Sequence, residues 1–117
     1  MGQSASQAAA FYKDVAKNKT LWTCQDENGV PAPLKPDGRR SMPFWSSLSR
    51  TQKIIASVPD YAAFEPLELS LDSFIKDWAP SLREGKLLVG LNWSGLNATG
   101  YDLEVNDVIS NISSRTT

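Results

Sequence analysis

The sequence predicts a single-domain α+β protein, in which a mostly antiparallel sheet of four to six strands packs against three to four helices. The chain has 117 residues, the length of one domain, and we expect residues 1–117 to form that domain with residues 1–4 frayed. Its hydrophobic content of 41% and charged content of 21% are typical of a folded protein. Segments with helical and strand periodicity follow one another along the chain, separated by Gly, Pro and Asn turns.

The first two predicted helices have apolar residues at helical spacing. One covers residues 5–18. The other begins after Ser46 or Ser47, either of which can act as N-cap, and ends at Pro59 because proline cannot continue a helix. The residues that this second helix would bury are Leu48, Ile54, Ile55 and Val58.

Two further helices are predicted in the second half of the chain. Ser70 is a suitable N-cap for one of them, and Pro80 is expected to end it. Its apolar positions follow the i, i+3, i+4, i+7 pattern and are Leu71, Phe74, Ile75 and Trp78. A closing helix, capped near Asn106, contains Val108, Ile109 and Ile112.

The strand predictions rest on short segments of β-branched, aromatic and aliphatic residues between turns. Residues 87–93 are nearly all apolar, which predicts a central strand that is covered on both faces. Residues 30–34 can pair with the preceding strand only at an edge, because Pro31 and Pro33 lack an N–H for the ladder. The other predicted strands are 20–24, 42–45, 65–69 and 101–105.

The residue counts exclude most catalytic chemistry. The chain has no histidine and one cysteine, so it cannot contain a Ser-His-Asp triad, a Cys-His dyad or a zinc site built from His and Cys. Carboxylate pairs remain at Asp26 with Glu27 and at Asp102 with Glu104, but both lie in polar turn or strand-edge contexts. We therefore expect no catalytic residue, no metal site and no cofactor.

The sequence favours a cytoplasmic location. Its first residues lack the basic and apolar regions of an export signal, and the lone Cys24 cannot form an intramolecular disulfide. No apolar run approaches the roughly 18 residues of a membrane-spanning helix, so we expect no membrane association. The oligomeric state stays open.

Charge is distributed unevenly along the chain. Residues 1–59 contain eight Lys or Arg and four Asp or Glu, a net charge of +4, whereas residues 60–117 contain four and nine, a net charge of −5. An acidic surface repels phosphate and attracts basic proteins, so we expect a protein partner and no nucleic acid. The alternative is that these charges are scattered in the folded protein.

Four tryptophans are candidates for the core or for an interface. Trp22, Trp45 and Trp78 lie in predicted strands or a predicted helix, which favours the core. Trp93 ends a strand next to the turn that begins at Ser94, so we expect it to be partly exposed at the rim of a loop.

Several segments together resemble a known bacterial family. They are Leu21–Gly29, Pro36–Gly38, Met42–Trp45 and Leu71–Leu82. In order and spacing, residues 11–112 resemble the family called domain of unknown function 2750, for which there is no established activity to transfer. In addition, Glu65–Val89 is similar to small α+β proteins of bacterial toxin-immunity families, which implies a protein partner.

These observations favour a non-enzymatic, cytosolic protein-binding module. The specific hypothesis is an immunity protein that acts as an inhibitor: it neutralises a bacterial toxin by blocking the toxin's active site, and a basic toxin domain is the expected partner. The expected partner-binding residues are Asp60, Tyr61, Glu65, Glu68 and Trp93. The alternative is a small-ligand-binding or enzymatic domain with a pocket lined by Trp22, Trp45 and Tyr101.

Overall fold

The computed structural model describes residues 3–115, and within them five strands form two sheets. In one sheet, β1 (Thr20–Gln25) pairs antiparallel with β3 (Glu65–Ser70). In the other, the order is β2 (Ser41–Phe44), β4 (Leu88–Ser94) and β5 (Thr99–Glu104); β2 is parallel to β4, and β5 is antiparallel to it. A backbone bridge between Trp22 and Trp45 joins the two sheets.

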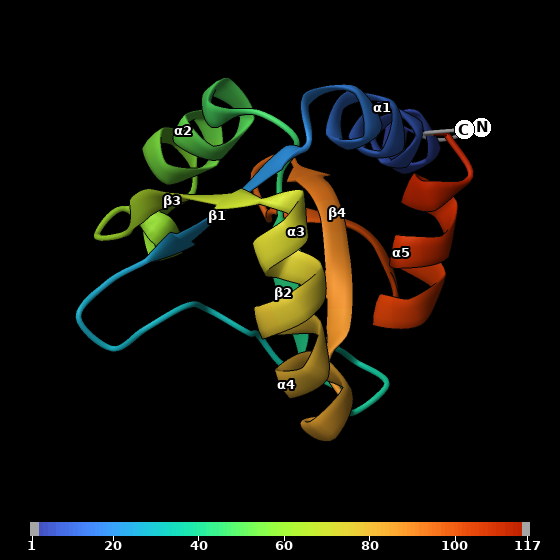
Figure 1. Ribbon diagram of the computed structural model, residues 1–117. Coiled ribbons are helices and arrows are strands. Elements are labelled where there is room, and N and C mark those ends of the chain that lie inside the picture. The colour runs from blue at the N-terminus through green and yellow to red at the C-terminus, as the bar shows by residue number, and fades with distance from the viewer. Residues whose placement is uncertain (1–2, 116–117) are drawn as a thin grey trace.

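The helices lie on both sides of these sheets (Figure 1). Helices α1 (Gln3–Asn18) and α5 (Val105–Ser113) pack together and against β4 and β5. A continuous helical segment, α3 (Leu71–Ser73), η2 (Phe74–Trp78) and α4 (Ala79–Glu84), lies in front of β2 and β4 in the view of Figure 1. Helix α2 (Leu48–Ser57) and the short turn η1 (Pro59–Tyr61) lie apart from the other helices and pack near β1 and β3. The predicted α+β class is confirmed.

The first of two hydrophobic cores, the main core, lies between the sheets and helices α1, α4 and α5. It is made of aliphatic and phenylalanine side chains, among which Phe44 and Phe74 pack edge to face with ring centroids 5.1 Å apart. Val89 and Leu91 of β4 are fully buried in it. Strand β4 is therefore central and covered on both faces, as its apolar sequence predicts.

A smaller second core lies on the other side of the sheets, under α2. Two tryptophans, Trp45 and Trp93, are its largest side chains. Cys24, Ile54, Val58, Tyr61 and Ala98 complete it. Trp22 and Trp78 are partly buried and pack against the second core and the main core respectively, so the predicted core positions of Trp22, Trp45 and Trp78 are confirmed.

Pro80 does not end the third helix, so that prediction is wrong. The Ser70 hydroxyl caps the helix by accepting a hydrogen bond from the Ser73 N–H, as predicted. The chain then forms a π-helical turn, in which the Ala79 N–H donates to the Phe74 carbonyl. This wider turn changes the hydrogen-bonding pattern just before Pro80, and the proline lies in the first turn of α4, where it is tolerated.

Other predicted details also need correction. Residues 30–34 form no strand, and β1 pairs with the distant β3 instead. Leu48 is 37% exposed, and Thr51 takes the buried position on α2. The Asn106 side chain does not cap α5 but accepts a hydrogen bond from Arg83. Of the residues expected to fray, Gln3 and Ser4 belong to α1, whereas residues 1 and 2 lie outside the described part.

Candidate functional site

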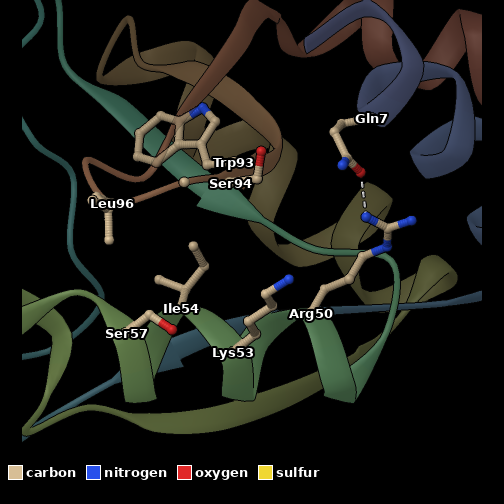
Figure 2. A pocket seen from close by; sticks show the side chains of 9 residues that line it. Gln7, Arg50, Lys53, Ile54, Ser57, Trp93, Ser94 and Leu96 are labelled. Atoms are coloured by element: carbon tan, nitrogen blue, oxygen red, sulfur yellow. Dashed lines mark hydrogen bonds between the residues drawn. The ribbon is translucent and has the colours of Figure 1, made fainter. Parts of the chain in front are cut away.

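A cleft of about 280 Å³ lies between α2 and the turn that joins β4 to β5 (Figure 2). Helix α2 contributes one wall, the β4–β5 turn contributes the opposite wall, and α1 closes one end with Gln7. We call it the basic cleft. Its lining residues are Gln7, Arg50, Lys53, Ile54, Ser57, Trp93, Ser94, Gly95 and Leu96.

The basic cleft combines two cations with an apolar surface. Arg50 and Lys53 are three positions apart on α2, so both lie on the same side of this helix. No acidic residue lines the cleft, and within residues 3–115 neither cation forms an ion pair with a carboxylate. Arg50 instead donates a hydrogen bond from Nη1 to the Gln7 Oε1 (Figure 2). An anionic group is therefore the complement that the cleft lacks.

Trp93 reaches the cleft because β4 contains a β-bulge. Leu91 pairs with Tyr101 and Ser94 pairs with Thr99, so β4 has one extra residue between these pairs. Asn92, inside this bulge, has φ of 47°. Regular alternation would place Trp93 on the side of Val89 and Leu91, in the main core, whereas the bulge directs it into the second core.

Two glycines make room for the Trp93 ring. A Cβ atom on Gly90 would lie 2.3 Å from Cε2 of Trp93, and a Cβ atom on Gly100 would lie 3.0 Å from its Cδ1. Any larger residue at position 90 would therefore displace the indole. The close fit explains why the prediction of a partly exposed Trp93 is wrong: the side chain is only 1% exposed.

A polar network fixes the indole of Trp93 from the other side. Its Nε1–H donates to Oδ1 of Asp102 at 3.0 Å, and the Ser41 hydroxyl donates to the same oxygen at 2.7 Å. The Lys35 ammonium lies 3.7 Å from Oδ2 of Asp102 and 4.0 Å from the centroid of the Trp93 ring. This wall of the cleft is thus held by hydrogen bonds, an ion pair and a cation–π contact.

Asn92 fixes the position of the other elements around the cleft. Its buried side-chain Oδ1 accepts from the Ser46 N–H at 2.8 Å, and its Nδ2 donates to the Gln7 carbonyl at 3.1 Å. The Ser46 hydroxyl, in turn, donates to Asp14 of α1 at 2.8 Å. Because Ser46 lies just before α2, these bonds tie α1 and α2 to the same point of β4.

The five residues expected to bind a partner do not form one surface. Asp60, Glu65 and Glu68 are exposed, but Glu65 and Glu68 lie an odd number of residues apart on β3 and so point to opposite faces. Tyr61 is 8% exposed, in the second core, where burial raises the pKa of its hydroxyl to about 12. Of the residues expected to line a ligand pocket, Trp45 is fully buried, Trp22 is half-buried and Tyr101 is exposed.

The charge difference between the two halves of the chain is partly cancelled in the fold. Lys35 pairs with Asp102, and Arg39 pairs with Glu104, so basic residues of the first half neutralise acidic residues of the second. The Arg39 hydrogen bond lowers the pKa of Glu104 and raises that of Arg39. These two ion pairs reduce the net negative charge that the second half presents.

Unpaired carboxylates gather at a second place, beside the ends of β1 and β3. Asp26, Glu27 and Glu65 line a shallow cleft there with Gln25 and Ala63, which we call the acidic cleft. No ion pair involves these three carboxylates in the described part of the chain.

The buried Cys24 lies near this cleft but is not an activated nucleophile. Burial, and to a lesser extent the charge of Asp26, raise the pKa of its thiol to about 12, so the thiol is protonated.

Sequence reasoning named Trp93, which lines the basic cleft, but missed its two cations. Arg50 and Lys53 stand on the predicted polar face of a helix, where cations are common, and nothing in the local sequence indicates which element lies opposite. The only available signal was their i, i+3 spacing without an acidic residue between Ser46 and Pro59.

The fold and the clefts define a small α+β protein with one basic cleft and one acidic cleft. Residues 8–112 match the family model described as "Protein of unknown function (DUF2750)", and the chain belongs to this family. This agrees with the resemblance seen in the sequence. A comparison with curated proteins finds no match. Among the helices of residues 3–115, none is long and apolar enough to cross a membrane.

Proposed function

We propose that this protein is a non-enzymatic binding module that recognises an acidic partner protein through the basic cleft. The observation that carries the proposal is that Arg50 and Lys53 border an apolar surface without any carboxylate to neutralise them. A partner that supplies an anionic side chain or terminus would complete these interactions while it covers apolar surface.

Binding fits the lining of this cleft better than catalysis. The residues that line it include the hydroxyls of Ser57 and Ser94, but no carboxylate that could act as a general base. The chain has no histidine for that role. The cleft thus has groups that recognise charge, and it lacks the acid–base pair that most hydrolytic and transfer reactions use.

Toxin immunity in the cytoplasm of a bacterium is a second candidate role, and the acidic cleft favours it. The exposed carboxylates of Glu27 and Glu65 and the half-buried one of Asp26 would pair with Lys or Arg of a basic toxin, in place of the phosphates of its substrate. Asp60 and Glu68 do not line the acidic cleft, so they would contribute only if the toxin contacts the surface beyond it.

The two candidates can be separated by affinity capture from a lysate of the native host. The protein is immobilised as wild type, as an Arg50→Glu/Lys53→Glu variant, and as an Asp26→Lys/Glu65→Lys variant. We expect a partner that the wild type and the acidic-cleft variant retain and the basic-cleft variant loses. The opposite pattern would assign binding to the acidic cleft, and a partner kept by all three variants would contradict both proposals.

Immunity has its own test. The product of the neighbouring gene is expressed with and without this protein, and growth is measured. Rescue by the wild type that the acidic-cleft variant fails to give would support toxin neutralisation. Absence of toxicity, or equal rescue by both proteins, would contradict neutralisation through these carboxylates.

A further inference from the structure

We infer that the ligand of the basic cleft is a carboxylate attached to a single apolar side chain. The C-terminal residue of a polypeptide has this chemistry, and so does a free small apolar acid. The inference rests on the proposed function, since it assigns a ligand chemistry to the same cleft. It follows from the arrangement of donors at one end of the cleft and of apolar groups at the other.

The donor end of the cleft can surround a carboxylate. A guanidinium has five N–H donors, and in Arg50 one N–H is used by Gln7. Lys53 adds an ammonium with three donors, and no hydrogen bond or ion pair within the described chain uses them. The Gln7 amide group, whose oxygen accepts from Arg50, lies at the same end (Figure 2). A planar carboxylate can accept two parallel bonds from the Arg50 fork, a geometry that arginine favours.

The apolar end of the cleft is formed by Ile54, Leu96 and the edge of Trp93. Leu96 stands at the tip of the β4–β5 turn with 80% of its surface exposed, and Figure 2 shows it on the opposite side of the opening from Ile54. Gly95 has φ of 82°, and its carbonyl accepts from the Ala98 N–H at 3.1 Å, so the turn that carries Leu96 is tight. A side chain of the ligand would contact Leu96 and Ile54 together.

The size of the cleft limits the ligand to a small group. Its volume of about 280 Å³ is at the lower limit of ligand pockets, which typically measure ~300–1,000 Å³. A ligand of about the size of one amino-acid residue matches this volume better than a larger one. A phosphate is also a poorer match, because the cleft lies along the side of α2 and offers no helix N-terminus, where backbone N–H groups bind phosphate.

Hydrogen bonds and ionic contacts hold several walls of the cleft before any ligand binds. Asn92 fixes α1 and α2, while Asp102 and Lys35 fix Trp93. Preorganised walls lower the entropy cost of binding, so even a small ligand can bind measurably.

The test is a titration of the full chain followed by NMR chemical shifts and by calorimetry. The probes are N-acetyl-leucine, its neutral carboxamide, inorganic phosphate, and a five-residue peptide that ends in leucine with either a free or an amidated terminus. We expect both free acids to shift the signals of Arg50, Lys53 and Leu96. The amidated forms should bind at least ten-fold more weakly.

Substitutions locate the site. Arg50→Gln should weaken binding of the free acid at least ten-fold. Leu96→Ser should weaken binding of N-acetyl-leucine more than binding of acetate, which is titrated in addition as an acid without an apolar side chain. Lys76→Gln is the matched control, because Lys76 is exposed and pairs with Asp72 away from the cleft. Circular dichroism of each variant verifies that it is folded. Equal binding of acid and amide, equal or tighter binding of phosphate, or equal effects of Arg50→Gln and Lys76→Gln would overturn the inference.

The outcomes also separate this inference from the proposed function. If a captured partner requires Arg50 but no acid or free-terminus peptide competes with it, the ligand chemistry is wrong and the binding function stands. If the acids bind and no partner protein depends on the cleft, the ligand chemistry stands and the proposed recognition of a partner protein is wrong. Tighter binding of the peptide than of N-acetyl-leucine identifies a chain terminus as the source, and the opposite order identifies a free acid.

Discussion

The main core and the second core of this protein differ in the side chains that build them. The main core is made of aliphatic and phenylalanine side chains, with Tyr12 at its margin, and its interior needs few hydrogen bonds. The second core is built around Trp45 and Trp93, whose indole N–H groups donate to the Trp93 carbonyl and to Asp102. The main core therefore chiefly stabilises the fold, whereas the second core also positions one wall of the basic cleft.

The largest loss of stability should come from the main core. Phe44→Ala removes a fully buried ring that packs against Phe74, and it should lower the free energy of unfolding by about 3–5 kcal/mol. Urea denaturation measures this loss. Binding of N-acetyl-leucine at low temperature, where the variant stays folded, should change less than two-fold. A large loss of binding in the folded variant would contradict the separation of the two cores.

Gly90→Ala should have a smaller effect on stability and a larger one on the cleft. The new methyl group overlaps the Trp93 ring, which must move, so we expect a loss of about 1–3 kcal/mol and a changed near-ultraviolet circular dichroism spectrum. In a Gly90→Ala/Trp93→Leu double variant the loss should be smaller than the sum of the two single losses, because the smaller side chain leaves room for the methyl group. Strictly additive losses in the double variant would show that the ring is not what Gly90 accommodates.

Asp102→Asn should cost less, about 1 kcal/mol. The amide oxygen can still accept from Trp93, but the charge that attracts Lys35 is gone. The loss measured by urea denaturation should become smaller in a Lys35→Met background, since no cation is then left without its partner. An unchanged loss in that background would mean that the ion pair does not contribute to holding the indole.

The smallest effect is a pH dependence that belongs to the second core. Burial raises the pKa of Cys24 from about 9 to about 12 and that of Tyr61 from about 10 to about 12. A group whose pKa is raised in the folded state contributes fully to the free energy of unfolding below its pKa in the unfolded state. This contribution is lost as the pH rises toward the pKa in the folded state. The free energy of unfolding should thus fall by roughly a few tenths of a kcal/mol at pH 9 and further at higher pH.

The control for this pH effect is the Cys24→Ala variant. It should begin to lose stability nearer pH 10, where Tyr61 alone would ionise on unfolding. Urea denaturation from pH 7 to pH 11 gives both curves. Coincident curves for the variant and the wild type would contradict a contribution from the Cys24 thiol.

Much of the fold could be predicted from the sequence, because it depends on local patterns. The apolar run of β4 identifies a central strand, and Ser70 identifies the start of a helix. The path beyond Pro80 could not be predicted, because no local pattern marks the π-helical turn before it, in which the Ala79 N–H donates to the Phe74 carbonyl.

The basic cleft was harder to predict, because it depends on segments that lie far apart in the sequence and meet only in the folded protein. A one-residue bulge at Asn92 moves Trp93 from one face of β4 to the other, and alternation alone places it on the wrong side. The roles of Arg50 and Lys53 depend on the β4–β5 turn, which is more than forty residues away in the chain and faces them only in the folded protein. Patterns within one segment do not contain this information.

The order of the strands has a consequence for the path of folding. β1 pairs with β3 and β2 pairs with β4, so the two pairings overlap along the chain, and neither encloses the other. A nascent chain that ends before Leu88 lacks the partner of β2 and the whole β4–β5 hairpin. Because the β1–β3 and β2–β4 pairings each close a long loop, the two sheets should assemble late and nearly together, after most of the protein has left the ribosome.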